Sequence, residues 1–207
     1  MTQAEWAEAT ARELLAESLP RRWAHTQGVA AAARSLAPVL GRDGDLLTAA
    51  AWLHDIGYAP GVARTGFHPL DGARHLRDAE GAGDVLCRLV AHHSCAINEA
   101  AERGLARDLA AEFRPARRDL ADALTYCDMT TSPDGQRLPV GHRLAEIRAR
   151  YGPDHLVNRA ITRSAPELTG AVARVTRRQA ACIPAPVTVP PARDRVPVLT
   201  ARLRPAV

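Results

Sequence analysis

The stretch Ala49-Ala50-Ala51-Trp52-Leu53-His54-Asp55-Ile56-Gly57 runs from apolar residues into a histidine–aspartate pair and then a glycine. It predicts a buried helix that ends at the pair, with Gly57 in the left-handed position that commonly follows a helix. Imidazole nitrogens and carboxylate oxygens are both metal ligands, so His54 and Asp55 can offer two donors to one site. One such dipeptide is common by chance, and the rest of the chain has to support it.

Further ligand-type residues lie on both sides of this stretch at helical spacing. His25 shares a helical face with Val29 and Leu36, which predicts that this histidine points toward the core. His68 stands just before Pro69, a residue favoured in the first turn of a helix. A histidine at a helix start can bind a metal without interrupting the helix. Both residues are therefore candidate ligands.

The next candidates follow later in the chain. An apolar helix ends in His92-His93, and their spacing from Leu89 leaves open which of the two histidines turns inward. Asp128 stands four residues after Leu124 on an apolar face, where an unpaired carboxylate would cost several kcal/mol. Taken singly, a satisfied core histidine or an arginine-paired aspartate explains each residue. Together they favour a metal site inside a helical bundle.

Composition also favours packed helices, since the chain is 46% hydrophobic but only 4% aromatic. Thr2 and Glu5 form a capping-box pattern that should start a first helix ending near Leu19. Asp45 is expected to cap the helix that carries the pair. Three apolar stripes between residues 140 and 175 predict three more helices, which pack beside the ligand-bearing bundle.

Six prolines follow residue 182, too many for a helix or a central strand. The sequence thus predicts an all-α domain over residues 1–182, with extra C-terminal helices, and a Pro/Arg-rich extended or disordered tail over residues 183–207. The tail lacks candidate ligands. It is a possible arm for homo-oligomer formation.

The net charge of +4 is concentrated at the C-terminal end, where residues 174–207 hold seven Arg and one Asp. The first 173 residues therefore sum to −2, and we expect no nucleic-acid polymer as partner. The four cysteines form no CxxC pair, and the chain shows neither a signal-peptide pattern nor an apolar run of about 20 residues. These features predict a cytoplasmic protein without a membrane partner.

The order His25…His54-Asp55…Asp128, with histidines between the last two motifs, resembles the HD-domain metal-dependent phosphohydrolase superfamily. The pair and the two residues after it match the HDIG form of the central motif, and the resemblance covers about residues 20–151. It is closest to the small stand-alone branch that includes diadenosine-tetraphosphate hydrolases and deoxynucleotidases. No Gly-Tyr-Pro segment follows the paired histidines, and no acidic residues soon follow the His–Asp pair. Both features argue against the cyclic-di-GMP and guanosine-tetraphosphate branches.

The resemblance implies an HD-type helical bundle with one or two divalent transition metal ions, Fe, Mn, Co, Ni or Zn, at its centre. It assigns a first metal to His25, His54, Asp55 and Asp128, and a second metal, bridged by Asp55, to His68 and either His92 or His93. The candidate catalytic residues are Asp55, His54 and His93. The candidate substrate-binding residues are Arg22 and Arg64, because the chain contains no Lys to bind phosphate.

The predicted reaction is hydrolysis of a phosphate ester or nucleotide by a metal-activated water, with a small phosphorylated metabolite or nucleotide as substrate. An unused histidine of the His92-His93 pair could protonate the leaving oxygen. The alternative is an HD-type di-iron oxygenase that cleaves a C–C or C–P bond with O₂. A degenerate HD binding module is a third, less favoured interpretation.

Overall fold

The computed structural model describes residues 1–182, which form ten α-helices and three short 3₁₀ helices. The α-helices are α1 (Gln3–Leu15), α2 (Pro20–Leu40), α3 (Gly44–Leu53), α4 (His68–Asp78), α5 (Asp84–His92), α6 (Ala96–Glu102), α7 (Ala106–Glu112), α8 (Arg118–Met129), α9 (Val140–Tyr151) and α10 (Leu156–Cys182). The 3₁₀ helices are η1 (Gly41–Asp43), η2 (Ile56–Tyr58) and η3 (His93–Cys95). The described residues include no β-strand, only an isolated bridge between Thr131 and Arg137. The predicted all-α fold is confirmed, and the predicted tail lies outside the described residues.

The start of α1 follows its sequence pattern. The Thr2 hydroxyl accepts a hydrogen bond from the backbone N–H of Glu5, and the Glu5 carboxylate accepts one from the backbone N–H of Thr2. The predicted end near Leu19 was wrong, because the helix stops at Leu15 and a turn follows it. The predicted capping box is confirmed.

Asp45 does not cap α3, as the sequence suggested. The helix already begins at Gly44, and the Asp45 carboxylate instead accepts hydrogen bonds from the backbone N–H groups of Gln3 and Ala4, at 3.1 and 3.3 Å. Those groups lie in the first turn of α1, where a helix has no internal acceptors. Asp45 therefore fastens the start of α1 to the start of α3.

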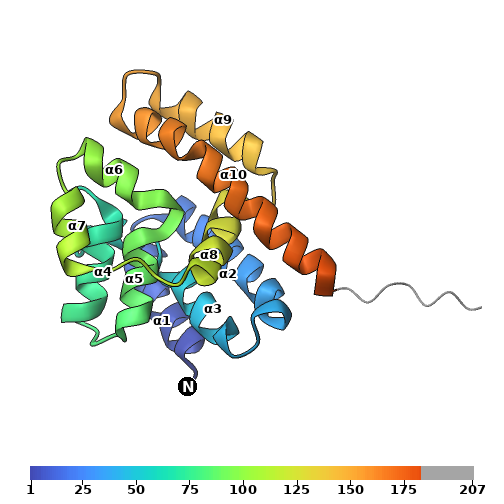
Figure 1. Cartoon of the computed structure of the whole chain (residues 1–207). Helices are drawn as coiled ribbons and strands as arrows, with labels where there is room; N and C mark the ends of the chain where they lie inside the picture. Colours follow the sequence, from blue (N-terminus) through green and yellow to red (C-terminus); the bar gives the residue numbers. More distant parts are fainter. Residues whose placement is uncertain (183–207) are drawn as a thin grey trace, which may run out of the picture.

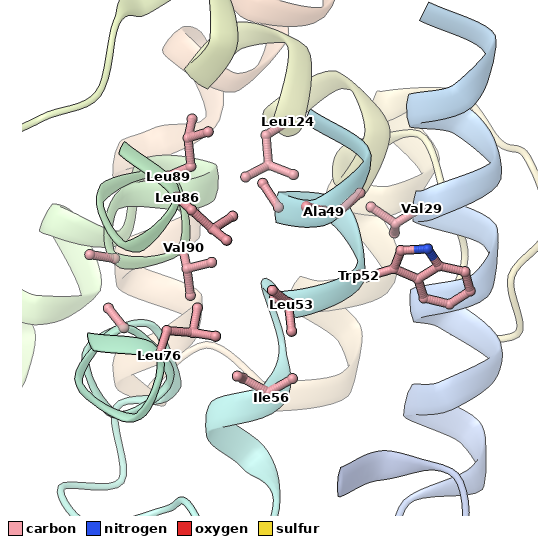
Figure 2. Close-up of a cluster of buried hydrophobic side chains, with 14 of the residues drawn as sticks. Val29, Ala49, Trp52, Leu53, Ile56, Leu76, Leu86, Leu89, Val90 and Leu124 are labelled. Carbon is pink, nitrogen blue, oxygen red and sulfur yellow. The ribbon is translucent and has the colours of Figure 1, made fainter. Parts of the chain in front are cut away.

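Helix α3 runs through the centre of the molecule. Every residue from Leu47 to Leu53 is buried, as expected for a helix that is apolar on all sides. Figure 2 shows Leu53 of α3 turned toward Val90 of α5, and Trp52 turned toward Val29 of α2. This packing fixes the C-terminal end of α3, and with it the histidine–aspartate pair that follows.

Gly57 is not in the left-handed conformation that the sequence predicted, since it is not among the described residues that have a positive φ angle. Its role is to allow close approach. A Cβ atom at this position would lie 2.0 Å from the carbonyl oxygen of His68 and 2.8 Å from the backbone nitrogen of Gly72. The missing side chain lets η2 lie directly against α4.

Helices α9 and α10 lie side by side along one flank of the bundle (Figure 1). Three helices were predicted here, but the last two apolar stripes belong to one continuous helix, α10, which contains Pro166. Ser164 is buried between the stripes, so the same face of the helix continues from Ala160 to Leu168. A small second core, centred on Leu168 and Met129, joins this pair of helices to α8. No helix within residues 1–182 is long and apolar enough to span a bilayer.

Candidate metal centre

The candidate ligands come from five separate elements and meet at the centre of the bundle. His54 and Asp55 follow the last residue of α3 and are 1% and 4% exposed. His25 comes from α2 and Asp128 from α8, and both are buried. His68 opens α4, and the paired histidines stand at the junction of α5 and η3. Residues that are as many as 103 positions apart therefore share one site.

A first group consists of His25, His54 and Asp128, with one potential ligand atom from each lying within 4.8 Å of the others. The Nδ1–H groups of the two histidines donate to the backbone carbonyls of Ser132 and Ala51, at 2.9 and 2.8 Å. A carbonyl oxygen only accepts, so in each neutral ring the lone pair is on Nε2. Both Nε2 atoms are turned toward the group, and that of His25 lies 3.1 Å from Asp128 Oδ1.

A second group consists of Asp55, His68 and His93. Asp55 Oδ1 lies 3.3 Å from His68 Nε2 and 4.0 Å from His93 Nε2, while Asp55 Oδ2 lies 3.5 Å from His54 Nε2. The Nδ1–H of His93 donates to the carbonyl of Val90 at 2.7 Å. Asp55 thus has Oδ1 near the second group, while Oδ2 lies near His54 of the first group and also accepts from Arg22.

The structure does not bring two of the predicted site residues into this cluster. The ring of His92 turns the other way, and its Nε2 contacts the carbonyl oxygen of Phe113 at 2.7 Å. The guanidinium of Arg64 donates to backbone carbonyls of its own loop, including that of Gly61 at 3.0 Å. Of the two histidines that the sequence could not separate, it is His93 that faces the centre.

The family model described as HD domain matches residues 22–128, more than half of the chain. The chain belongs to the HD domain family. HD domains form a superfamily of metal-dependent hydrolases, and both groups of candidate ligands fall within the matched range. No curated protein and no solved structure matches the chain.

The protonation states in this HD domain suit metal ligation. Burial lowers the pKa of His54 to about 4 and lowers the pKa of His68 well below its ordinary value. Burial alone would raise the pKa of Asp55, but the positive charge of Arg22 and the nearby imidazoles outweigh it and lower that pKa. Burial alone would also raise the pKa of Asp128, but the nearby rings of His25 and His54 and the guanidinium of Arg143 outweigh it and lower that pKa. Neutral imidazoles and ionised carboxylates are the forms that bind metal.

Two features of this HD domain are explained by a bound cation. Within the described residues the buried Nε2 of His54 has no hydrogen-bond partner, and an unsatisfied buried polar atom costs about 1–3 kcal/mol. The lone pair on Nε2 of a neutral His25 faces the Asp128 carboxylate, so two acceptors lie 3.1 Å apart. A divalent transition ion would satisfy all three donors, and the mixture of imidazole and carboxylate suits Fe, Mn, Co, Ni or Zn. The residues therefore fit the predicted metal.

An aromatic side chain that sequence reasoning left in a loop supports the second group. The ring of Tyr58 stacks on His68 with a centroid separation of 3.9 Å. The guanidinium of Arg22 lies over the Tyr58 ring, 3.5 Å from its centroid. Arg22 also donates to Asp55 Oδ2. Arg22 is thus placed in the site, as the sequence suggested, and Tyr58 fixes its position.

Ser94 is a second residue that the sequence analysis missed. Its hydroxyl donates to Asp128 Oδ2 and so orients the carboxylate whose other oxygen faces His25. Ser94 and Cys95 both have positive φ angles, 49° and 60°, a conformation that costs about 1–2 kcal/mol per residue. Neither is Gly or Asn, so the sequence carried no signal for this turn.

The two groups border a cavity of about 120 Å³. Asp55, His68 and His93 line one end of it, together with Arg22. The other side is formed by α9 and α10, beyond the range that the family model matches. A small molecule in this cavity would contact both the candidate ligands and an arginine.

Proposed function

We propose that this HD domain is a metal-dependent phosphohydrolase that acts on a small phosphate ester or nucleotide. The observation that carries the proposal is the position of Asp55 between two groups of nitrogen and oxygen donors, at the end of a cavity. A divalent ion supplies a Lewis acid there, which lowers the pKa of water and neutralises charge on phosphoryl oxygens.

The roles of the chain's own residues follow from the contacts. His25, His54 and Asp128 would hold one ion, Asp55, His68 and His93 would hold a second, and Asp55 lies close enough to His54 to contribute to the first as well. The backbone carbonyls that accept from the Nδ1–H groups of three of these histidines keep the rings in the metal-binding tautomer. Arg22 keeps Asp55 ionised when no metal is present.

The leaving oxygen requires a different proton source from the one that the sequence suggested. The expected donor was whichever histidine of the His92-His93 pair does not bind metal, but the ring nitrogen of His92 contacts a backbone carbonyl outside the cavity. We propose that Asp55, at the cavity end, is the residue that relays protons in the reaction, while His93 serves as a metal ligand. We also propose His54 as a catalytic residue, because its Nε2 lies 3.5 Å from Asp55 Oδ2.

The test combines metal analysis with a substrate panel. The purified full-length protein should carry one or two equivalents of a transition metal, or be activated by adding one. It should then release phosphate from p-nitrophenyl phosphate or from nucleotides, both in air and under argon. The absence of bound metal together with failure of every added metal to activate would refute the proposal. Activity that requires iron and O₂ would instead favour the oxygenase, which the same donor set also fits.

A further inference from the structure

One wall of the cavity is formed by helices that lie outside the matched HD range. Helices α9 and α10 begin after residue 139, whereas the family match ends at residue 128 (Figure 1). The cavity volume is about 120 Å³, and an apolar cavity of about 150 Å³ is known to accept a benzene ring. The volume of the cavity therefore suits a compact organic group such as a single ring.

Arg143 of α9 is a buried cation on this wall. Its side chain is 10% exposed; Nη1 donates to Glu146 Oε2 at 2.6 Å, and Nη2 lies 4.0 Å from Asp128 Oδ1. Its Nε atom is buried and has no hydrogen-bond partner in the described part of the chain. An unused donor on a buried guanidinium is unfavourable unless an acceptor is supplied. Arg143 lines the cavity, so a ligand bound there can contact its guanidinium group.

The charge balance of the cavity favours an anion as that ligand. Beyond the candidate metal ligands, the charged residues that line it are Arg22, Arg143, Arg150 and Glu99, and Glu146, which is not part of the lining, pairs with Arg143 and Arg150, so an excess of one positive charge remains. Guanidinium groups bind phosphate through parallel N–H donors and stay charged at all relevant pH values. Arg22 lies near Asp55 and Arg143 lies near Asp128. An anion bound to these two arginines would therefore be close to both groups of candidate ligands.

Several side chains of the α9–α10 wall are apolar, although Tyr151 and Ser164 add hydroxyl groups to it. Ile147 of α9 and Ala160 of α10 are buried, Val157 and Ile161 of α10 are partly buried, and Met129 at the end of α8 is 2% exposed. These side chains offer contact area to an uncharged organic group but few hydrogen bonds to a sugar or a base. The wall therefore offers apolar contact to the organic part of a ligand.

We propose that this cavity binds the phosphate ester of a compact apolar group, with Arg143 holding the phosphate and the α9–α10 wall holding the organic part. This inference rests on the proposed phosphohydrolase activity and narrows its substrate class. Arg143 acts as a binding and specificity-determining residue, outside the segment that the family model recognises.

The experiment uses three phosphate-like probes that lack a hydrolysable ester: inorganic phosphate, methylphosphonate and phenylphosphonate. Each is titrated by calorimetry, under argon, into the full-length protein without metal and loaded with Mn²⁺. In the wild type, phenylphosphonate should bind about tenfold more tightly than methylphosphonate, because the ring buries apolar area against the wall. Arg143→Gln should weaken binding of all three probes by about 10- to 100-fold, and Arg143→Lys by less.

Two matched controls separate a local effect from a general one. Arg148→Gln changes an arginine on the same helix that contacts Thr162 rather than the cavity, and should leave binding unchanged. Ile161→Ser should reduce the preference for phenylphosphonate without altering phosphate affinity, whereas Ile97→Ser, at an exposed site, should do neither. Thermal melts of each variant check folding, and Arg143→Lys retains the charge in case Arg143→Gln does not fold.

The outcomes distinguish this inference from the proposed function. The inference is wrong if Arg143→Gln binds the probes as the wild type does. It is also wrong if the wild type binds none of the probes or does not prefer phenylphosphonate. Each of these results counts against the inference even when the protein hydrolyses phosphate esters. If the probes bind as expected but no ester is hydrolysed with any metal, the anion site stands and the phosphohydrolase proposal fails.

Discussion

Replacement of Gly57 by alanine should destabilise the protein and remove the second group of candidate ligands. The added Cβ would lie 2.0 Å from the carbonyl oxygen of His68, 2.7 Å from its carbonyl carbon and 2.8 Å from the backbone nitrogen of Gly72. Favourable contact between such atoms begins at about 3.5 Å, so η2 and α4 must separate by about 1.5 Å. All three atoms belong to the backbone, and no side-chain rotation can relieve the clash.

The cost can be estimated from this geometry. Overpacking of a core costs about 1–3 kcal/mol, and a clash with backbone on a fixed helix belongs at the upper end. For a chain of this length, about 3 kcal/mol lowers the melting temperature by roughly 6–12 °C. The same displacement carries His68 away from Asp55, and because a functional site tolerates about 0.5 Å of error, the second ion should be lost.

The assay compares Gly57→Ala with Gly61→Ala. No described atom lies within 4 Å of the position that a Cβ on Gly61 would take, so this control adds a methyl group to the same loop without a clash. Thermal melts and elemental analysis are recorded for both variants. Gly57→Ala should melt lower and hold at most the metal of the first group, while Gly61→Ala should match the wild type. Wild-type stability and metal content in Gly57→Ala would refute the reasoning from close approach.

Three further predictions follow from the site. His93→Ala should lower the metal content and His92→Ala should not, since only His93 faces Asp55; equal loss in elemental analysis would contradict the structure. As pH falls from about 6.5 to 4, His54 becomes protonated in the unfolded chain but not in the folded metal-free protein. The free energy of unfolding of the metal-free protein should therefore drop by about 3 kcal/mol over this range in denaturant titrations. A free energy of unfolding that does not change with pH would show that His54 is not buried in its neutral form. Gly28→Ala should weaken metal binding in a chelator competition, because the added Cβ would lie 2.5 Å from the carbonyl oxygen of Gly135, in the turn that supports the first group. Unchanged metal affinity would show that this turn does not position the first group of candidate ligands.

Much of the fold was readable from local patterns. The capping box at Thr2 and the apolar stripe of α3 each depend on neighbouring residues alone, and both predictions are confirmed. Predictions failed where a distant segment decided the outcome. Asp45 was expected to cap its own helix but binds the start of α1, and Gly57 was expected to end a helix but instead admits α4.

The candidate site divides in the same way. Helical periodicity placed His25 and Asp128 on inward faces, because each lies within a regular helix. Periodicity could not choose between His92 and His93, since α5 ends at the first and the chain turns at the second. Arg64 was chosen only for its place in a loop after the pair, and its hydrogen bonds to neighbouring carbonyls hold it there.

Arg143 shows why a family match indicates the chemistry of this chain but does not identify its substrate. In the sequence this residue stands next to Leu144 in what reads as an ordinary amphipathic helix with a solvated arginine. Only the tertiary packing of α9 and α10 against α8 turns it inward, 4.0 Å from the candidate ligand Asp128. The matched range supplies every candidate metal ligand, whereas the residues after it supply the wall that an organic group would touch. Two chains that share the first feature can therefore differ in substrate, and exchanging side chains on α9 and α10 should change selectivity while leaving metal content unaltered.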